Sequence, residues 1–254
     1  MNKDNIILRE LANKYFEIAN SDKNKQNMLL HKKVNDLEQP RPIVLIDEIP
    51  WKEMNINGEL TLQCENDFNR NIENFFRTNI FKWTHIPGDM VLRPYYSVPK
   101  IINSKGIGVK KLISEHQQDS LSHTFVDQFQ TEEDLEKLHN DVISYDVEST
   151  MQNYFKVSNI LGDILPVKVS GQATGYALGC KTMDDIVNFR GLETFFYDFI
   201  ERPDFMHKLI SKLTDIFIDT IQQYDNLGLF DGDAYYIHST CALTNDLKPD
   251  QSHV

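Results

Sequence analysis

The chain has 254 residues, of which 41% are hydrophobic and 25% are charged, as in an ordinary globular protein. It contains no run of ~18 apolar residues, so no membrane-spanning helix is expected. With 26 basic and 38 acidic residues its formal net charge is −12, which argues against nucleic acid as a partner because phosphate backbones would be repelled.

The three cysteines and the N-terminal segment bear on the cellular compartment of the protein. Cys64, Cys180 and Cys241 lie far apart, and the first sixteen residues are charged throughout and lack the apolar stretch of a signal peptide. A reducing environment without a disulfide framework follows. We therefore expect a cytoplasmic protein.

The first forty residues are predicted to be helical. Ile7, Leu11, Tyr15 and Ile18 recur at spacings of three and four, which places them on one helix face. Residues 20–22 (Asn-Ser-Asp) interrupt this pattern and can cap a second helix. The prolines at 40 and 42 end it, so residues 1–40 are expected to form an N-terminal helical extension.

A continuous apolar run at residues 43–46 follows, typical of a buried strand in a parallel sheet. It leads into Asp47, Glu48 and, after Ile-Pro, Trp51. Carboxylates and a tryptophan at the end of a buried strand are common at active sites of α/β proteins. The alternative is that Asp47 and Glu48 cap the next segment or pair with lysines.

The remaining chain alternates between helical and strand-like segments. A second strand at residues 89–96 ends in Tyr95 and Tyr96, and residues 106–130 resemble a β-hairpin excursion. Helices are expected at residues 67–83, 134–138, 146–161, 184–189, 191–200 and 205–227. Core strands are expected at residues 43–47, 90–94, 165–170 and 234–238. The alternation predicts an α/β fold with a mainly parallel sheet.

The last of these strands ends in His238 and Cys241. Imidazole and thiolate are ligands that zinc prefers, but a catalytic zinc needs about three protein ligands. Cys180, Cys64, Glu48 or Asp47 could complete the set. The alternative is a buried cysteine beside a hydrogen-bonded histidine.

Four stretches that spread over most of the chain stand out: RPIVLIDEIPW (41–51), DILPVKVSG (163–171), GLETFFYDFIERPD (191–204) and YIHSTCA (236–242). In this order they resemble the uroporphyrinogen decarboxylase superfamily, especially its branch near the corrinoid-dependent methyltransferases. The resemblance implies that residues 41–254 belong to a TIM-type (β/α)8 barrel with its site at the C-terminal strand ends. Glu48, Tyr95, Tyr96 and His238 are expected there.

The methyltransferase branch implies transfer of a methyl group from a small methylated compound. Zinc and a corrinoid carried by a partner protein would take part. Glu48 and Tyr95 are then the expected catalytic residues, and His238 and Cys241 the expected metal ligands. Asp47, Trp51, Tyr96 and Lys168 are expected to bind substrate. The metal motif departs from the family's His-x-Cys pattern, because Thr240 lies two residues after His238 and no cysteine follows Cys241.

Two alternatives stay open. A porphyrinogen decarboxylase is less consistent with the sequence, because the family's arginine-rich motif is replaced by Asp-Glu-Ile-Pro-Trp at residues 47–51, whose two acids would repel a polycarboxylate. The other alternative is a catalytically silent interaction module. Only four core strands are expected where a barrel needs eight, so we expect a C-terminally truncated barrel whose open edge can bind a second copy or another protein.

Overall fold

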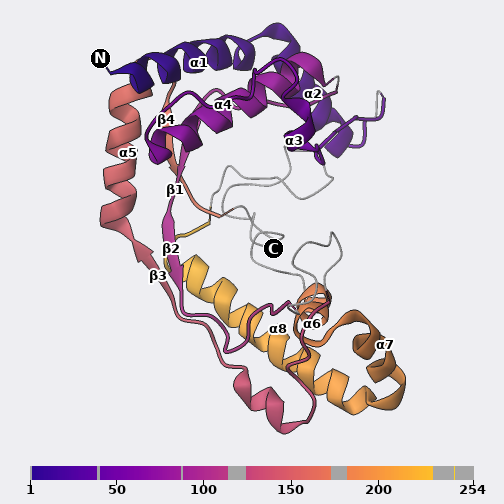
Figure 1. The fold of residues 1–254 in the computed structure, drawn as a ribbon. Coiled ribbons are helices and arrows are strands. Elements are labelled where there is room, and N and C mark those ends of the chain that lie inside the picture. The colour runs from indigo at the N-terminus through magenta and orange to yellow at the C-terminus, as the bar shows by residue number, and fades with distance from the viewer. Residues whose placement is uncertain are drawn as a thin grey trace. The chain divides into compact units, whose positions relative to one another are not determined.

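A computed structural model describes residues 2–38, 41–86, 88–113, 124–172, 182–230 and 243 (Figure 1). The described residues form a mixed α/β structure. The chain divides into two compact units. Unit 1 comprises Met1–Lys100, Val147–Thr174 and Asp231–Val254, and unit 2 comprises Ile101–Asp146 and Gly175–Phe230. Within the described residues, no helix is long and apolar enough to cross a membrane.

Four of the five described helices of unit 1 were expected from the sequence, and the short one at Trp51–Met54 was not. The five are α1 (Lys3–Ala19), α2 (Asp22–Asn35), the short α3 (Trp51–Met54), α4 (Asp67–His85) and α5 (Val147–Leu161). The side chains of Asn2 and Ser21 cap α1 and α2 by accepting bonds from backbone N–H groups three residues on. Asn66 caps α4 in the same way.

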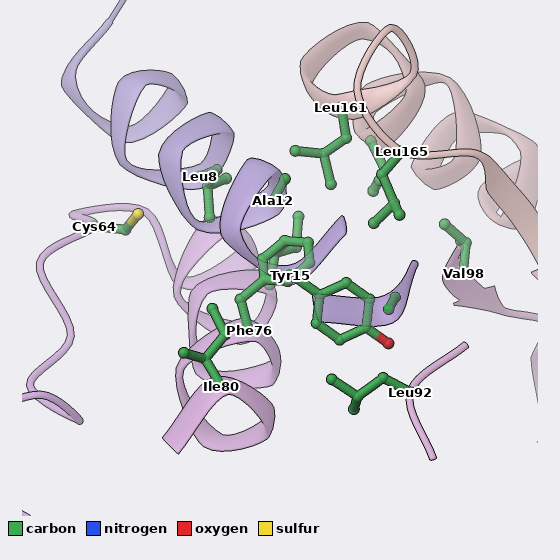
Figure 2. Close-up of a cluster of buried hydrophobic side chains, with 13 residues drawn as sticks. Leu8, Ala12, Tyr15, Cys64, Phe76, Ile80, Leu92, Val98, Leu161 and Leu165 are labelled. Atoms are coloured by element: carbon green, nitrogen blue, oxygen red, sulfur yellow. The ribbon is translucent and has the colours of Figure 1, made fainter. Parts of the chain in front are cut away.

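The core of unit 1 joins α1 to α4 and α5 (Figure 2). Leu8, Ala12 and Tyr15 recur at helical spacing on α1 and are almost fully buried, as are Phe76 of α4 and Leu161 of α5. Helix α1 therefore shares a core with later segments of the chain. The boundary expected at residue 40 is therefore not a boundary between units 1 and 2, because unit 1 includes residues on both sides of it.

Where unit 1 is described, two of its strands pair in parallel. Strand β1 (Tyr96–Pro99) pairs with β4 (Val167–Ser170), with Val98 opposite Val169. Helix α5 precedes β4 in the chain and contacts both strands. The strand expected at residues 165–170 and its parallel pairing are thus confirmed.

The strands expected at residues 43–47 and 90–94 are wrong, since neither segment forms a strand. The two segments do contact each other. The Asp89 N–H donates to the Val44 carbonyl at 2.8 Å, and the Val44 N–H donates to the Asp89 carboxylate at 2.9 Å. Only the first of these two bonds joins two backbone groups. The contact therefore does not continue as the backbone ladder of a sheet.

Helix α2 supplies the partners that a neighbouring strand would otherwise provide for residues 89–92. The buried Asn24 carboxamide donates to the Leu92 carbonyl at 2.8 Å and accepts from the Leu92 N–H at 2.9 Å. Asn27 and His31, on the same face of α2, contact carbonyl oxygens of the same segment at 2.9 and 2.7 Å. Backbone polar groups held by side chains are satisfied without strand pairing.

The described residues of unit 2 form an antiparallel strand pair, one 3-10 helix and three α-helices. Strand β2 (Ile101–Ser104) pairs with β3 (Ile143–Asp146), and η2 (Glu133–Lys137) is a short 3-10 helix. Helices α6 (Thr182–Arg190), α7 (Leu192–Glu201) and α8 (Pro203–Asn226) lie close to the predicted ranges. Their core includes residues from all three helices and from the segment before η2: Phe129, Ile186, Phe195, Leu209 and Leu213.

The expected excursion and barrel are described only in part. Ile113 and Phe125 form an antiparallel bridge, and residues 114–123 between them lie outside the described residues. The strand expected at residues 234–238 also lies outside them. The described residues hold two separate two-stranded sheets, one parallel and one antiparallel, and no closed barrel.

Candidate functional site

A cavity of about 370 Å³ lies within unit 1. Helices α1, α2 and α4 contribute to its wall, together with residues 45–47 and 90–97. The lining combines apolar and polar side chains: Tyr15, His31, Leu45, Asp47, Phe75, Asn79, Lys82, Met90, Val91, Leu92, Arg93, Tyr95 and Ser97. A mostly apolar hollow with a few convergent polar groups is typical of a small-molecule site. We call it the unit 1 pocket.

Asp47 and Lys82 form an ion pair in the wall of this pocket. The Asp47 carboxylate lies 2.9 Å from the Lys82 ammonium, and only 18% of the lysine side chain is exposed. Asp47 therefore lines the pocket and pairs with a lysine, as one of the two sequence interpretations of this residue expected. The pairing also offsets the negative charge that argued against an acidic substrate.

Tyr95 lies among cationic groups. Arg93 donates a hydrogen bond to the Tyr95 hydroxyl at 2.7 Å, and its guanidinium carbon lies 5.9 Å from the centre of that ring. The Lys168 ammonium lies 4.3 Å from the same ring centre. Lys168 comes from β4, opposite the strand that follows Tyr95. The parallel pair thus brings two of the predicted site residues together, and the Lys168 ammonium makes a cation–π contact with the tyrosine ring.

Tyr15 supports this part of the pocket from α1. Its hydroxyl donates to the Arg93 carbonyl at 3.0 Å, and Figure 2 shows the hydroxyl pointing toward the segment that carries Leu92. Burial raises the pKa of the Tyr15 phenol, so it stays protonated as a donor. The bond fixes the backbone from which Arg93 projects.

His31 is uncharged near neutral pH. Its side chain is buried, and burial lowers its pKa despite the nearby Asp89 carbonyl and carboxylate. The Nε2 atom lies 2.7 Å from the Asp89 carbonyl, so that nitrogen carries the proton of the neutral ring. The Asp89 carboxylate meanwhile accepts two hydrogen bonds from Arg41, at 2.6 and 2.8 Å.

The other predicted residues lie elsewhere. Glu48 is exposed and does not line the pocket. Trp51 begins α3 and its ring lies 6.2 Å from that of Phe81. Tyr96 packs into the core against Phe75 and Phe76, and burial raises its pKa to about 12. Successive residues of an extended chain face opposite sides, so Tyr95 and Tyr96 separate into pocket and core.

The expected metal ligands His238 and Cys241 lie outside the described residues. Within the described part of the chain, no group of three or more His, Cys, Asp or Glu side chains could hold a metal ion.

Comparison with protein-family models, with curated proteins and with solved structures gives no match for this chain. The unit 1 pocket is therefore interpreted from its own chemistry. Lys82, Arg93 and His31 line it but were not predicted as site residues. Arg93 carries the clearest signal in the sequence, because it lies in the same predicted strand as Tyr95, two residues before it.

Proposed function

We propose that the chain is a small-molecule enzyme whose substrate binds in the unit 1 pocket. The observation that carries this proposal is the convergence of Asp47 and Tyr95 on one cavity. Asp47 and Tyr95 follow two segments that form no strands but contact each other through backbone and side-chain hydrogen bonds between Val44 and Asp89. The pocket adds Lys82 and Arg93, which hold these two side chains in place.

The reaction class that we propose is methyl transfer from a small methylated compound, on the strength of the resemblance to the methyltransferase branch. In this proposal the apolar wall receives the body of the substrate. Asp47 and the Tyr95 hydroxyl orient its polar part, because both are themselves held by a cation. Preorganised polar groups in a hollow cost little reorganisation when substrate binds.

We further propose that unit 1 belongs to a (β/α)8 barrel of the uroporphyrinogen decarboxylase superfamily. The parallel β1–β4 pair supports this, since barrel strands are all parallel. Helix α5 supports it as well, because it precedes β4 and packs on both strands, as a crossover helix does.

Zinc and a corrinoid carried by a partner protein complete the proposal. His238 and Cys241 would hold the zinc, with a third ligand from elsewhere in the chain. A bound zinc lowers the pKa of a thiol and so supplies thiolate at neutral pH.

Metal analysis of the purified protein tests the zinc proposal. We expect about one zinc per chain, as in a mononuclear site, and less than about a tenth of that in His238→Ala and in Cys241→Ala. His139→Ala is the matched control, because His139 is exposed and its Nδ1 atom lies 2.9 Å from the neighbouring Asn140 carbonyl. Less than about a tenth of a zinc in the unaltered chain, with no change in His238→Ala, would contradict the proposal.

A further inference from the structure

We infer that Arg93 binds the carboxylate of a small monoanionic substrate in the unit 1 pocket. This inference rests on the proposed function in one respect, namely that the pocket is the substrate site. It adds the chemical class of the substrate.

Arg93 differs from the other arginines of unit 1. Its guanidinium is partly buried in the pocket wall, yet no carboxylate of a described residue contacts it. Arg70 bonds a backbone carbonyl at 3.0 Å, outside the pocket. The remaining three all pair with carboxylates: Arg9 with Asp163, Arg41 with Asp89, and Arg77 with Glu73. A guanidinium withdrawn from water without a counter-charge is costly, and a bound anion would remove that cost.

The charge balance of the pocket favours a monoanion. Asp47 neutralises Lys82 at 2.9 Å, and burial keeps His31 uncharged. Among the residues that line the pocket, the positive charge of Arg93 is then not balanced by a carboxylate. A carboxylate carries one negative charge and matches it, whereas a phosphate dianion would bring a second charge without a partner.

The donor geometry of Arg93 suits a carboxylate. A guanidinium has five N–H donors in a planar fork, and the Tyr95 hydroxyl accepts from one of them. The remaining donors can meet both oxygens of a carboxylate in parallel, which is the strongest hydrogen-bonding arrangement of this pair. The Tyr15 bond to the Arg93 carbonyl fixes the backbone behind it at 3.0 Å.

The walls of the pocket define the rest of the molecule. Leu45, Phe75, Met90 and Leu92 supply apolar surface, and the volume of about 370 Å³ limits the ligand to a small one. A carboxylate at Arg93 therefore carries an apolar or aromatic body of modest size. Benzoate has this chemistry and is a suitable probe, and benzamide is its uncharged equivalent of the same shape.

Calorimetric titration of the full chain with benzoate, benzamide and phenyl phosphate tests the inference. We expect benzoate to bind at least about tenfold more tightly than benzamide, because a charge-assisted hydrogen bond is lost with the amide. Arg93→Gln should abolish this preference by weakening benzoate binding far more than benzamide binding, and Arg93→Lys should keep part of it. Arg70→Gln is the matched control, since Arg70 is also a partly buried arginine of unit 1, and the preference should persist there.

Three results would overturn the inference. The first is that the unaltered chain binds benzoate no better than benzamide, or binds neither. The second is that Arg93→Gln retains the preference for benzoate, and the third is that phenyl phosphate binds more tightly than benzoate, which would assign a phosphate to the site in place of a carboxylate. Zinc content measured on the same sample separates the two proposals. Zinc without a benzoate preference contradicts this inference alone, and a benzoate preference without zinc contradicts the methyltransferase proposal alone.

Discussion

Replacement of Arg190 by methionine is expected to destabilise unit 2 by about 3–5 kcal/mol. Arg190 is the buried centre of an ionic cluster, with Nη2 at 3.0 Å from the equally buried Asp198 and Nη1 at 3.0 Å from Asp127. It also donates to the Phe129 carbonyl and lies over the Phe205 ring. Methionine keeps much of the volume but leaves the Asp198 carboxylate buried without its main partner, which accounts for the large effect.

Hydrogen exchange measured peptide by peptide distinguishes this effect from a general loss of stability. Exchange in α6, α7 and α8 should accelerate in Arg190→Met, while exchange in α1 of unit 1 serves as the internal reference. Arg202→Met is the matched control, because Arg202 also packs on Phe205 but is 30% exposed and lies 4.0 Å from Asp198. Its cost should stay below about 1 kcal/mol. Equal exchange in Arg190→Met and in the unaltered chain would show that the cluster contributes no stability.

Asp89→Asn is expected to remove a pH-dependent contribution to the stability of unit 1. Hydrogen bonds from Arg41 hold the pKa of the Asp89 carboxyl at about 2, below its ordinary value of 3.8, although burial acts in the opposite direction. A carboxyl with a lowered pKa in the folded state stabilises that state above pH ~4, and the contribution disappears as the pH falls toward ~2. Because the Arg41 side chain is 52% exposed, solvent screening limits the contribution to about 1–2 kcal/mol.

Denaturant unfolding followed by tryptophan fluorescence measures this contribution, because Trp51 and Trp83 both belong to unit 1. The difference in unfolding free energy between the unaltered chain and Asp89→Asn should be largest above pH ~4 and shrink toward pH ~2. Asp22→Asn, at an exposed aspartate with a Lys25 contact of 3.6 Å, should change stability by less than about 0.5 kcal/mol throughout. A difference for Asp89→Asn that does not vary with pH would contradict the assignment.

The helices could be predicted from the sequence because their signals are local. Ile7, Leu11, Tyr15 and Ile18 mark the side of α1 that packs against the core of unit 1, although the most buried positions are the adjacent Leu8 and Ala12. Ser21 provides the side-chain oxygen that caps α2. The strands at residues 43–47 and 90–94 could not be judged in this way, because an apolar run does not reveal what lies beside it. The partners of the second segment are Asn24, Asn27 and His31 of α2.

The sequence predicts part of the candidate site, namely the residues that follow apolar segments, and misses the residues that helices contribute. Asp47 and Tyr95 were expected to face a pocket because they follow apolar segments, and both line one. Lys82 and His31 come from helices that the sequence indicated only as packing elements. Their place in the pocket depends on how these helices pack, which the pattern within each helix does not determine. The spacing of Asn24, Asn27 and His31 on α2 is the sequence signal that indicates a buried polar face.

That the binding site lies in the unit 1 pocket is tested most directly by hydrogen exchange with and without saturating benzoate. The pocket predicts slower exchange in residues 43–47 and 90–97, which form one side of the cavity, and unchanged exchange in α6, α7 and α8. Arg93→Gln should lose the protection. Protection confined to α6–α8, or no protection anywhere in the chain, would contradict a ligand site in unit 1.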